Sequence, residues 1–411
     1  MSRRVVVTGL GAVCPTGNTM PAAWDALLHG RSGIGRITLF DPSPYAVQIA
    51  GEVKGFSIAG RVDPKRARHM DRHVQFAVVA AQEALADANV AVTAENRDRI
   101  GVIVGSAAGG VQTLLNAQHT LEARGPDRVN PFFLPNFLAD AATGHIAIET
   151  GAAGPNFSTV SACATGGHAI GEAMNAIARG DADVVIAGGT DTVVLPITLA
   201  GFINMKGLAA DNEHPERASR PFDKDRGGFV ISEAAAVLIL EELEHARARD
   251  AHIYAEVTGY GATNDAFHMF AQAEDGEGAA RAMSRALHSA RLNPDEVDYI
   301  NAHGTGTPLN DRVETHAIKR VFGPRAYALA VSSTKSMTGH MMGASGALEG
   351  AICALVIRHG VIPPTINLDT PDPECGLDYV PHTAREQKVR VALSNSIGLG
   401  GHNAAIILRA L

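Results

Sequence analysis

One cysteine of this sequence stands where a nucleophile can be built. Cys163 lies in the segment VSACATGGHAIGEA, directly after a short β-like run and directly before a Gly-rich helix start. The unpaired N–H groups and positive dipole end of such a helix would stabilise a thiolate and lower the pKa of the thiol. Cys14, Cys353 and Cys375 lack this context, and we interpret them as structural. The spacing predicts that Cys163 is a catalytic nucleophile.

Two histidines stand in glycine-rich segments at places where an α/β protein carries reactive groups. His303 lies in NAHGTGTP, after a predicted strand, and His340 lies in TKSMTGHMMGASGALEG, before a predicted helix. Loops at the carboxyl ends of parallel strands collect functional side chains. A neutral imidazole of fixed tautomer donates one hydrogen bond, and two such donors can hold a carbonyl oxygen as it becomes an enolate. Most of the 17 histidines are expected to be surface or structural, but these two are predicted to be functional.

Several shorter motifs are incomplete. The segment GLGAVC at Gly9 has Cys14 where a dinucleotide fingerprint needs its third glycine, and GSAAGG at Gly105 lacks the Lys-Ser/Thr of a phosphate loop. We expect their glycines to serve tight turns. His69 and His73 are spaced i, i+4, but no glutamate follows the first histidine as a zinc protease requires. The sequence predicts no metal site, and the absence of a G-x-S-x-G elbow argues against a serine hydrolase.

The composition indicates a compact globular protein. Its 411 residues are 46% hydrophobic and 19% charged, which excludes disordered and low-complexity classes. Thirty-five Lys and Arg against 43 Asp and Glu give a net charge of −8, the wrong sign for a surface that coats nucleic acid or anionic lipid. No apolar run reaches the roughly 18 residues of a membrane span, and the four cysteines form no C-x-x-C pair. We therefore expect a cytoplasmic protein.

The elements that position these residues alternate along the whole chain, as is typical of α/β proteins. Short β-branched runs predict strands at residues 5–8, 100–104, 184–187, 236–240, 254–257, 297–301, 329–332, 391–394 and 405–408. Apolar residues at helical spacing predict helices at residues 74–88, 167–179, 277–290, 311–321 and 346–358. Several of these helices are rich in Ala and Gly, so we expect them to be buried and closely packed.

An internal repeat indicates the domain organisation. The run VTGLGA at residues 7–12 recurs as VTGYGA at residues 257–262, and each half ends with a Gly-Gly pair, an Ala run and an apolar strand. The sequence therefore predicts two copies of one α/β unit, residues 1–250 with Cys163 and residues 251–411 with both histidines, joined near a charged helix at residues 241–250. Functional residues are expected between the copies, where concave sites form.

Six separated segments resemble, in family order, the β-ketoacyl-acyl carrier protein synthase II class of condensing enzymes. The segments are RRVVVTGLGAV, ACATG, ASRPFDKDRGGFV, AHGTGTPLND, STKSMTGH and GLGGHN. The resemblance covers essentially the full length. It implies a thiolase-like fold of two duplicated α/β halves in an αβαβα arrangement, and a homodimer or a heterodimer with a chain-length-factor homologue. The implied activity is the decarboxylative Claisen condensation of malonyl-carrier with an acyl group, which elongates a fatty acyl or polyketide chain.

The resemblance implies a role for each matching residue. Cys163 would be the acyl-accepting nucleophile, His303 and His340 the pair that drives decarboxylation, and Lys335 the support beside them. The backbone amides of Cys163 and Leu399 would form the oxyanion hole. No redox or nucleotide cofactor is implied, since the substrates are carried on the phosphopantetheine arm of an acyl carrier protein.

Further residues of this sequence match family positions that bind the carrier and its arm. Thr305 and Thr307 would hold the phosphopantetheine arm, and Glu349 would take part in a polar or cation-linked network behind the site. Three cations would dock the acidic carrier: Lys65, Arg68 and Lys206. The first two belong to the basic cluster GRVDPKRARHMDRH, which is otherwise a solvated helix start.

The sequence departs from the family pattern around the predicted acyl pocket. Leu399 replaces the phenylalanine of the family's G-F-G-G loop, and Ile397 replaces a second aromatic ring two residues earlier. Ala108 stands where a bulkier residue often lines the acyl tunnel, and Phe270 stands where a small polar residue usually meets the carrier arm. These departures keep open an alternative, a type II polyketide ketosynthase subunit that works with a non-catalytic chain-length partner.

Two further alternatives are weaker. A degradative thiolase uses a second cysteine near the C-terminus, where this chain has GLGGHN. A non-catalytic chain-length partner typically lacks the nucleophile, whereas Cys163 and both histidines are present here.

Overall fold

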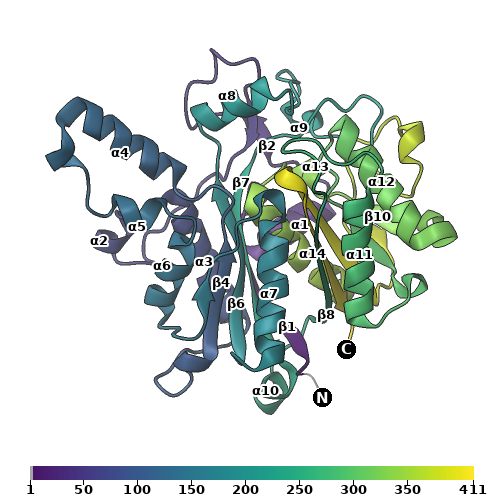
Figure 1. Ribbon diagram of the computed structural model, residues 1–411, viewed down its shortest axis with the longest axis horizontal. Helices are drawn as coiled ribbons and strands as arrows, with labels where there is room; N and C mark the ends of the chain where they lie inside the picture. The colour runs from purple at the N-terminus through teal and green to yellow at the C-terminus, as the bar shows by residue number, and fades with distance from the viewer. Residues whose placement is uncertain (1–2) are drawn as a thin grey trace.

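The predicted strands come together in one ten-stranded mixed sheet in the computed structural model, which describes residues 3–411 (Figure 1). The strands of this sheet are β1 (Val5–Val13), β4 (Ile100–Gly105), β5 (Asn156–Phe157), β6 (Val184–Thr192), β7 (Glu233–Glu242), β8 (Ala255–Asn264), β9 (Tyr299–Asn301), β10 (Ala330–Ser332), β13 (Val391–Gly398) and β14 (His402–Arg409). Two short pairs lie apart from it: β2 (Ile34–Arg36) with β3 (Ile49–Gly51), and β11 (Val361–Ile362) with β12 (Arg385–Glu386). Each predicted strand is present, and the short strands β2, β3, β5, β11 and β12 were not predicted.

Helices cover both outer faces of the sheet and fill the space between its halves. The helices are α1 (Met20–Leu28), α2 (Pro64–Ala67), α3 (Arg72–Asp87), α4 (Val111–Arg124), α5 (Phe133–Phe137), α6 (Ala141–Thr150), α7 (Thr165–Arg179), α8 (Pro196–Asn204), α9 (Pro215–Ala218), α10 (Leu243–Ala248), α11 (Glu277–Ala290), α12 (Pro308–Phe322), α13 (Lys335–Thr338) and α14 (Ser345–His359). Helices α3 and α6 pack on one half-sheet, α11 and α12 on the other, and α7 packs against α14 between them. Within residues 3–411, no helix is long and apolar enough to cross a membrane.

The two halves of the sheet repeat one topology. Read outward from the centre, the order β1-β7-β6-β4-β5 matches β8-β14-β13-β9-β10. In both halves the three inner strands are antiparallel and the outer strands run parallel to their neighbours. The halves meet where β1 pairs antiparallel with β8. This duplicated and layered arrangement confirms the predicted fold class.

The repeated VTG-x-GA segment has a packing role in each half. Gly9 and Gly11 lie in β1 beneath α3, and Gly261 lies at the matching place in β8 beneath α11. A Cβ at Gly11 would stand 2.0 Å from the carbonyl oxygen of Ala80, and a Cβ at Gly261 would stand 2.0 Å from that of Ala282. Only glycine lets the helix approach the strand so closely. The expected tight-turn role of Gly9 is therefore wrong.

The starts of α7 and α14 are in contact, and this contact positions the reactive groups. A Cβ at Gly166, in the first turn of α7, would stand 2.6 Å from the amide nitrogen of Ala347 in α14. Because glycine leaves this space open, the two helix starts meet. Cys163 lies two residues before α7 and His340 lies five residues before α14, so the two predicted reactive side chains come from neighbouring turns of different halves.

Candidate active site

Cys163 lies in a short 3₁₀ turn (Ala162–Ala164) that leads directly into α7. The residue before it, Ala162, has a positive φ of 49°, and Met342 has a φ of 48°. Each of these two residues lies three positions before its helix begins, so the halves share the same sharp turn. A positive φ strains a residue that carries a Cβ, and such strain persists only where the surrounding fold imposes it. The fold therefore imposes the same turn in both halves, and each turn directs the start of a helix toward the site.

Three predicted reactive groups converge in the structure. The Sγ atom of Cys163 and one ring nitrogen from each of His303 and His340 all lie within 4.8 Å of one another. The two ring centroids are 5.3 Å apart and the rings are nearly perpendicular, at 86°. All three side chains are buried. One half of the fold supplies the sulfur and the other supplies both imidazoles.

The hydrogen bonds around His340 fix its tautomer. Nδ1 accepts a hydrogen bond from the Met342 amide at 3.2 Å and lies 3.1 Å from Ser345 Oγ. An amide N–H can only donate, so Nδ1 carries no proton and the proton is on Nε2. Ser345 Oγ accepts from the Met341 amide at 3.0 Å, which leaves its own hydrogen for Nδ1. The ring therefore has one donor left for a ligand, Nε2–H.

The backbone at His303 is held by a carboxylate beneath it. The N–H groups of His303 and Gly304 donate to the two oxygens of Glu314 in α12, each at 2.8 Å, and Asn395 Nδ2 donates to the same group at 2.8 Å. Burial raises the pKa of Glu314 to about 7 although these three bonds oppose the rise. Glu314 positions the loop that carries His303.

Both imidazoles are neutral near pH 7. Burial lowers the pKa of His303 and of His340 well below the ordinary value, and the positive charge of Lys335 lowers both further. Lys335 is itself buried and forms an ion pair with Glu349, whose side chain is fully enclosed. The positive charge of Lys335 thus adds to the effect of burial in favouring the neutral form of both rings.

The thiol of Cys163 differs from the prediction. Burial raises its pKa to about 11, although the hydrogen bond from the Leu399 amide and the charge of Lys335 both lower it. The predicted lowering of this pKa is therefore wrong for the free protein. The helix start lies where the sequence placed it, but removal of the sulfur from water outweighs the local dipoles. A pKa above neutrality favours the thiol form of Cys163 near pH 7.

A cavity of about 360 Å³ opens over these groups. It brings together most of the predicted site residues: Cys163, Lys206, Phe270, His303, Thr305, Thr307, His340 and Leu399. Sequence reasoning missed other residues of its wall: Phe202, Met205, Phe229, Gln272 and Met342. These positions carry no motif, because an apolar or amide side chain is common anywhere and only the folded chain shows which ones meet.

Three predicted binding residues lie outside this cavity. Ala108 is exposed on the loop that follows β4, where its N–H donates to the buried Asp191 at 3.1 Å. Ala108 is not among the residues that line this cavity, and its predicted place on an acyl tunnel stays a prediction. Lys65 and Arg68 lie at α2. Arg68 lines a separate hollow of about 430 Å³ together with other arginines: Arg72, Arg124 and Arg128.

The three converging groups are close enough to hold a metal ion, but one hydrogen bond opposes it. A histidine that ligates a metal usually donates its other ring N–H to an acceptor. His340 does the opposite, since its Nδ1 accepts from the Met342 amide, and the proton stays on Nε2. The arrangement therefore favours a pair of hydrogen-bond donors. His69 and His73 are engaged separately, one stacked on an aromatic ring and one bonded to a carboxylate.

Comparison with known families decides which fold family this geometry belongs to. The model of the β-ketoacyl synthase N-terminal domain matches residues 2–246, and that of the C-terminal domain matches residues 254–369. The chain belongs to the β-ketoacyl synthase family. Two curated β-ketoacyl synthases named 3-oxoacyl-[acyl-carrier-protein] synthase 2 are similar along their whole length. The protein from Staphylococcus aureus (strain COL) is 48% identical, and that from Synechocystis is 50% identical, each over 99% of this chain and 98% of its own.

Solved structures of β-ketoacyl synthases superpose on the full chain. A β-ketoacyl synthase from Burkholderia phymatum STM815 has a TM-score of 0.93 at 35% identity, and the ishigamide ketosynthase/chain length factor has 0.92 at 37%. A type II polyketide ketosynthase, solved in complex with its acyl carrier protein and bound to a hexaketide, has 0.91 at 34%. Each match covers 100% of both chains.

Proposed function

We propose that this protein is a β-ketoacyl-acyl carrier protein synthase that loads an acyl group onto Cys163 and condenses it with malonyl-carrier. The observation that carries the proposal is the convergence of Cys163, His303 and His340 within 4.8 Å at the floor of one cavity. A sulfur nucleophile beside two neutral imidazoles supplies both halves of a decarboxylating condensation.

In the first half, Cys163 sulfur attacks the carbonyl carbon of an acyl-carrier thioester. The carbonyl oxygen becomes an oxyanion and accepts hydrogen bonds from the amides of Cys163 and Leu399. Gly398 lies against this hole, since a Cβ there would stand 3.1 Å from the Cys163 nitrogen. The carbon–sulfur bond to the carrier then breaks, and the thiol proton of Cys163 passes to the departing carrier thiolate. Because this thiol has a pKa of about 11, proton loss accompanies attack and does not precede it.

In the second half, malonyl-carrier enters and its carboxylate leaves as carbon dioxide. The electrons of the broken carbon–carbon bond move into the thioester carbonyl, whose oxygen accepts hydrogen bonds from His303 and His340. Both rings are neutral, so each offers an N–H to the thioester oxygen, and neither ring forms an ion pair with the malonyl carboxylate. The enolate carbon attacks the acyl group, Cys163 leaves as a thiolate, and a proton from solvent restores the thiol. No redox or nucleotide cofactor takes part.

The acyl chain is proposed to be fatty rather than polyketide. The relatives named 3-oxoacyl-[acyl-carrier-protein] synthase 2 are 48% to 50% identical, whereas the ketosynthases of the ishigamide and hexaketide structures are 34% to 37% identical. Ile397 and Leu399 both line the cavity, and Leu399 is 36% exposed. Aliphatic side chains here give a smaller and more flexible gate than phenylalanine, which is the feature that keeps a polyketide chain as the alternative.

The function is tested by giving the purified protein saturated acyl-carriers of several lengths with malonyl-carrier and measuring β-ketoacyl-carrier and carbon dioxide by mass spectrometry. We expect condensation with medium-chain acyl groups. Leu399→Phe is expected to reduce the rate with the longest chains about tenfold and to leave short chains within about twofold, because the ring narrows the gate. Leu309→Phe, on another part of the wall, is the matched control. A protein that forms polyketide-length products and rejects saturated chains would overturn this assignment.

The acidic carrier is proposed to dock on positive charge at two places. Lys206 lies at the cavity, while Lys65 and Arg68 lie near the arginine-lined hollow. Exposed cations within reach of an acidic partner raise the association rate and orient the encounter.

The four cysteines are buried and free, which supports a reducing, cytoplasmic location for the reaction.

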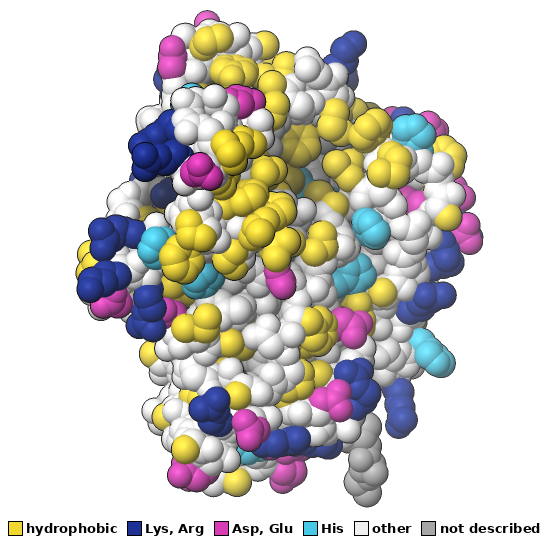
Figure 2. All heavy atoms as spheres, turned by 60° about the vertical axis from the view of Figure 1, so that its left-hand side comes forward, with side chains coloured by type: hydrophobic (Ala, Val, Ile, Leu, Met, Phe, Trp, Pro, Cys, Tyr) yellow, Lys and Arg dark blue, Asp and Glu magenta, His cyan; other side chains and the backbone are white. Residues whose placement is uncertain are grey.

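A second copy of the chain, or a homologue such as a chain-length factor, is proposed to cover one apolar face. Figure 2 shows hydrophobic side chains gathered on the face that carries α4 and α5. The exposed members are Leu114, Leu115, Leu121, Phe132, Leu134, Leu138, Phe157 and Val160. Beside them β5 is an exposed strand at the edge of the sheet, and such edges pair readily with another chain.

If this apolar face is a dimer interface, one charged side chain introduced into it should weaken the dimer. Leu134 is 61% exposed in the single chain. Leu134→Glu is expected to shift the molar mass measured by light scattering from dimer toward monomer, because an unpaired carboxylate would be buried at the contact. Ile197→Glu, an exposed position on α8, is the control and is expected to leave the mass unchanged. A wild-type protein that is monomeric at every concentration would contradict the interface.

A further inference from the structure

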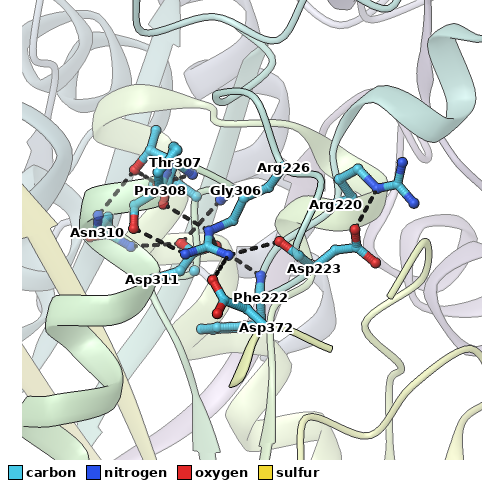
Figure 3. Close-up of polar contacts among 12 residues, drawn as sticks. Arg220, Phe222, Asp223, Arg226, Gly306, Thr307, Pro308, Asn310, Asp311 and Asp372 are labelled. Carbon is cyan, nitrogen blue, oxygen red and sulfur yellow. Dashed lines mark hydrogen bonds and ion pairs between the residues drawn. The ribbon is translucent and has the colours of Figure 1, made fainter. Parts of the chain in front are cut away.

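A buried arginine outside the catalytic cavity holds the backbone of the cavity wall. Arg226 lies in the loop between α9 and β7, and its side chain is 3% exposed. Its guanidinium donates from Nε to the Thr307 carbonyl at 3.2 Å and from Nη2 to the Pro308 carbonyl at 3.0 Å. These carbonyls belong to the segment that enters α12, so one planar group reaches two successive peptide units (Figure 3).

Two carboxylates and a carbonyl fix the guanidinium in turn. Nη1 donates to Asp372 at 2.6 Å and to the Asp223 carbonyl at 2.7 Å, and Nε lies 3.4 Å from the buried Asp311. The coulombic attraction of Asp311 and the hydrogen bond to Asp372 outweigh burial and raise the pKa of Arg226, so it stays charged. Figure 3 shows these side chains arriving from separate segments to meet at one centre.

The same network grips the segment from its other side. Asp311 accepts hydrogen bonds from the amides of Gly306 at 3.2 Å and Phe222 at 2.8 Å. The Gly306 amide is therefore held by Asp311, while the carbonyls of Thr307 and Pro308 are held by Arg226. A peptide segment with both its donors and its acceptors held in this way keeps one conformation.

Two glycines make the conformation of this segment depend on its contacts with the rest of the fold. Gly304 has a φ of 35° and Gly306 has a φ of 81°, and glycine leaves the backbone free to adopt many other conformations. The hydroxyls of Thr305 and Thr307, 3.0 Å apart, line the cavity between and beside these glycines. Arg226 and Asp311 therefore share the positioning of these hydroxyls with the Gly228 amide, which donates to the Gly306 carbonyl at 3.1 Å.

We infer that Arg226 is a positioning residue that sets the two threonine hydroxyls for the pantetheine arm of the carrier. The inference rests on the proposed function, in which Thr305 and Thr307 hold that arm. Arg226 is not part of the cavity wall, so it acts through the peptide units of Thr307 and Pro308. Lysine keeps the charge near Asp311 and Asp372 but has no planar fork that reaches both carbonyls.

Arg226→Lys is therefore expected to raise KM for malonyl-carrier about tenfold and to change kcat by less than about twofold, since hydrogen bonds to the arm are weakened equally throughout the reaction. This rise in KM is expected to disappear with malonyl N-acetylcysteamine, a thioester that lacks most of the pantetheine arm. Arg220→Lys is the matched control, because Arg220 pairs with Asp223 and Asp369 and its side chain does not reach the segment. An equal rise in KM with the truncated thioester would overturn the inference.

A double-mutant cycle tests whether the effect passes through the threonine. If it does, Arg226→Lys adds less than about twofold to KM in a Thr307→Ala background, and full additivity would refute the route. A second assay needs no condensation: pantetheine should protect Cys163 of the wild type from iodoacetamide, and Arg226→Lys should require about tenfold more pantetheine. If the wild type condenses but both proteins need the same pantetheine concentration for protection, the proposed function stands and the role of Arg226 is refuted. If the wild type does not condense but Arg226→Lys still needs about tenfold more pantetheine, the role of Arg226 stands and the proposed function is refuted.

Discussion

Cys163→Ala is expected to abolish both acyl loading and condensation, with a loss of at least about 10⁴-fold, while malonyl decarboxylation continues. Loading requires a sulfur, and the variant has none within the cavity to replace it. Decarboxylation requires only the donors that receive charge on the thioester oxygen. Those donors, His303 and His340, stand on separate elements that the substitution leaves in place. The enolate that forms in the variant takes a proton from solvent, so malonyl-carrier becomes acetyl-carrier and carbon dioxide.

Intact-mass measurement separates these outcomes in one experiment. Wild type exposed to acyl-carrier should gain the mass of one acyl group, and Cys163→Ala should gain nothing, while both release carbon dioxide from malonyl-carrier. Cys14→Ala is the matched control, because Cys14 is equally buried but lies away from the cavity. An acyl adduct on the Cys163→Ala protein would remove the nucleophile from the mechanism. Loss of decarboxylation together with loading would instead mean that the sulfur, and not the imidazole pair, organises the site.

The sequence predicted those features of the site that depend on local order along the chain. Cys163 was placed at a helix start because a β-like run, small residues and a Gly-rich helix follow one another there. The duplicated topology followed from the VTG-x-GA repeat, and the structure adds its reason, since Gly11 and Gly261 allow equivalent helices to touch equivalent strands. Local order also separated His303 and His340 from the other histidines.

Features that depend on burial or on distant partners were beyond such reasoning. The pKa of Cys163 is raised by loss of water around the sulfur, which no neighbour in sequence determines. Ala108 was expected to line an acyl tunnel by its position in the family pattern, but it is not in the wall of this cavity, and its amide bonds to Asp191, 83 positions along the chain. Arg226 contacts the chain at Thr307 and Asp372, 81 and 146 positions away. Its role is visible only when these segments are folded together.

His340→Ala is expected to reduce malonyl decarboxylation by about 10²- to 10³-fold while acyl loading of Cys163 stays within about threefold. The ring supplies one of two donors to the developing oxyanion, and loading uses the amides of Cys163 and Leu399 in its place. His340→Gln is expected to recover part of the lost rate, because a side-chain amide also offers a neutral N–H. His214→Ala, an exposed histidine before α9, serves as the control. A loss of loading as large as the loss of decarboxylation would contradict this division of labour.

The pH dependence distinguishes a neutral donor from a titrating acid. Burial and Lys335 lower the pKa of His340 well below its ordinary value, so the imidazole has already lost its second proton throughout about pH 6 to 8. Titration of His340 should therefore leave the decarboxylation rate of the wild type constant across that pH range. Protonation at lower pH would give an imidazolium, whose extra proton must displace the Met342 amide from Nδ1. The rate is expected to fall on that acid side, and His340→Gln should lose the part of this fall that belongs to His340, while His303, whose pKa burial also lowers, keeps its own part. A rate that rises as pH falls from about 8 to 6, and loses that rise in His340→Gln, would show that imidazolium is the active form and that the Met342 amide does not set the tautomer.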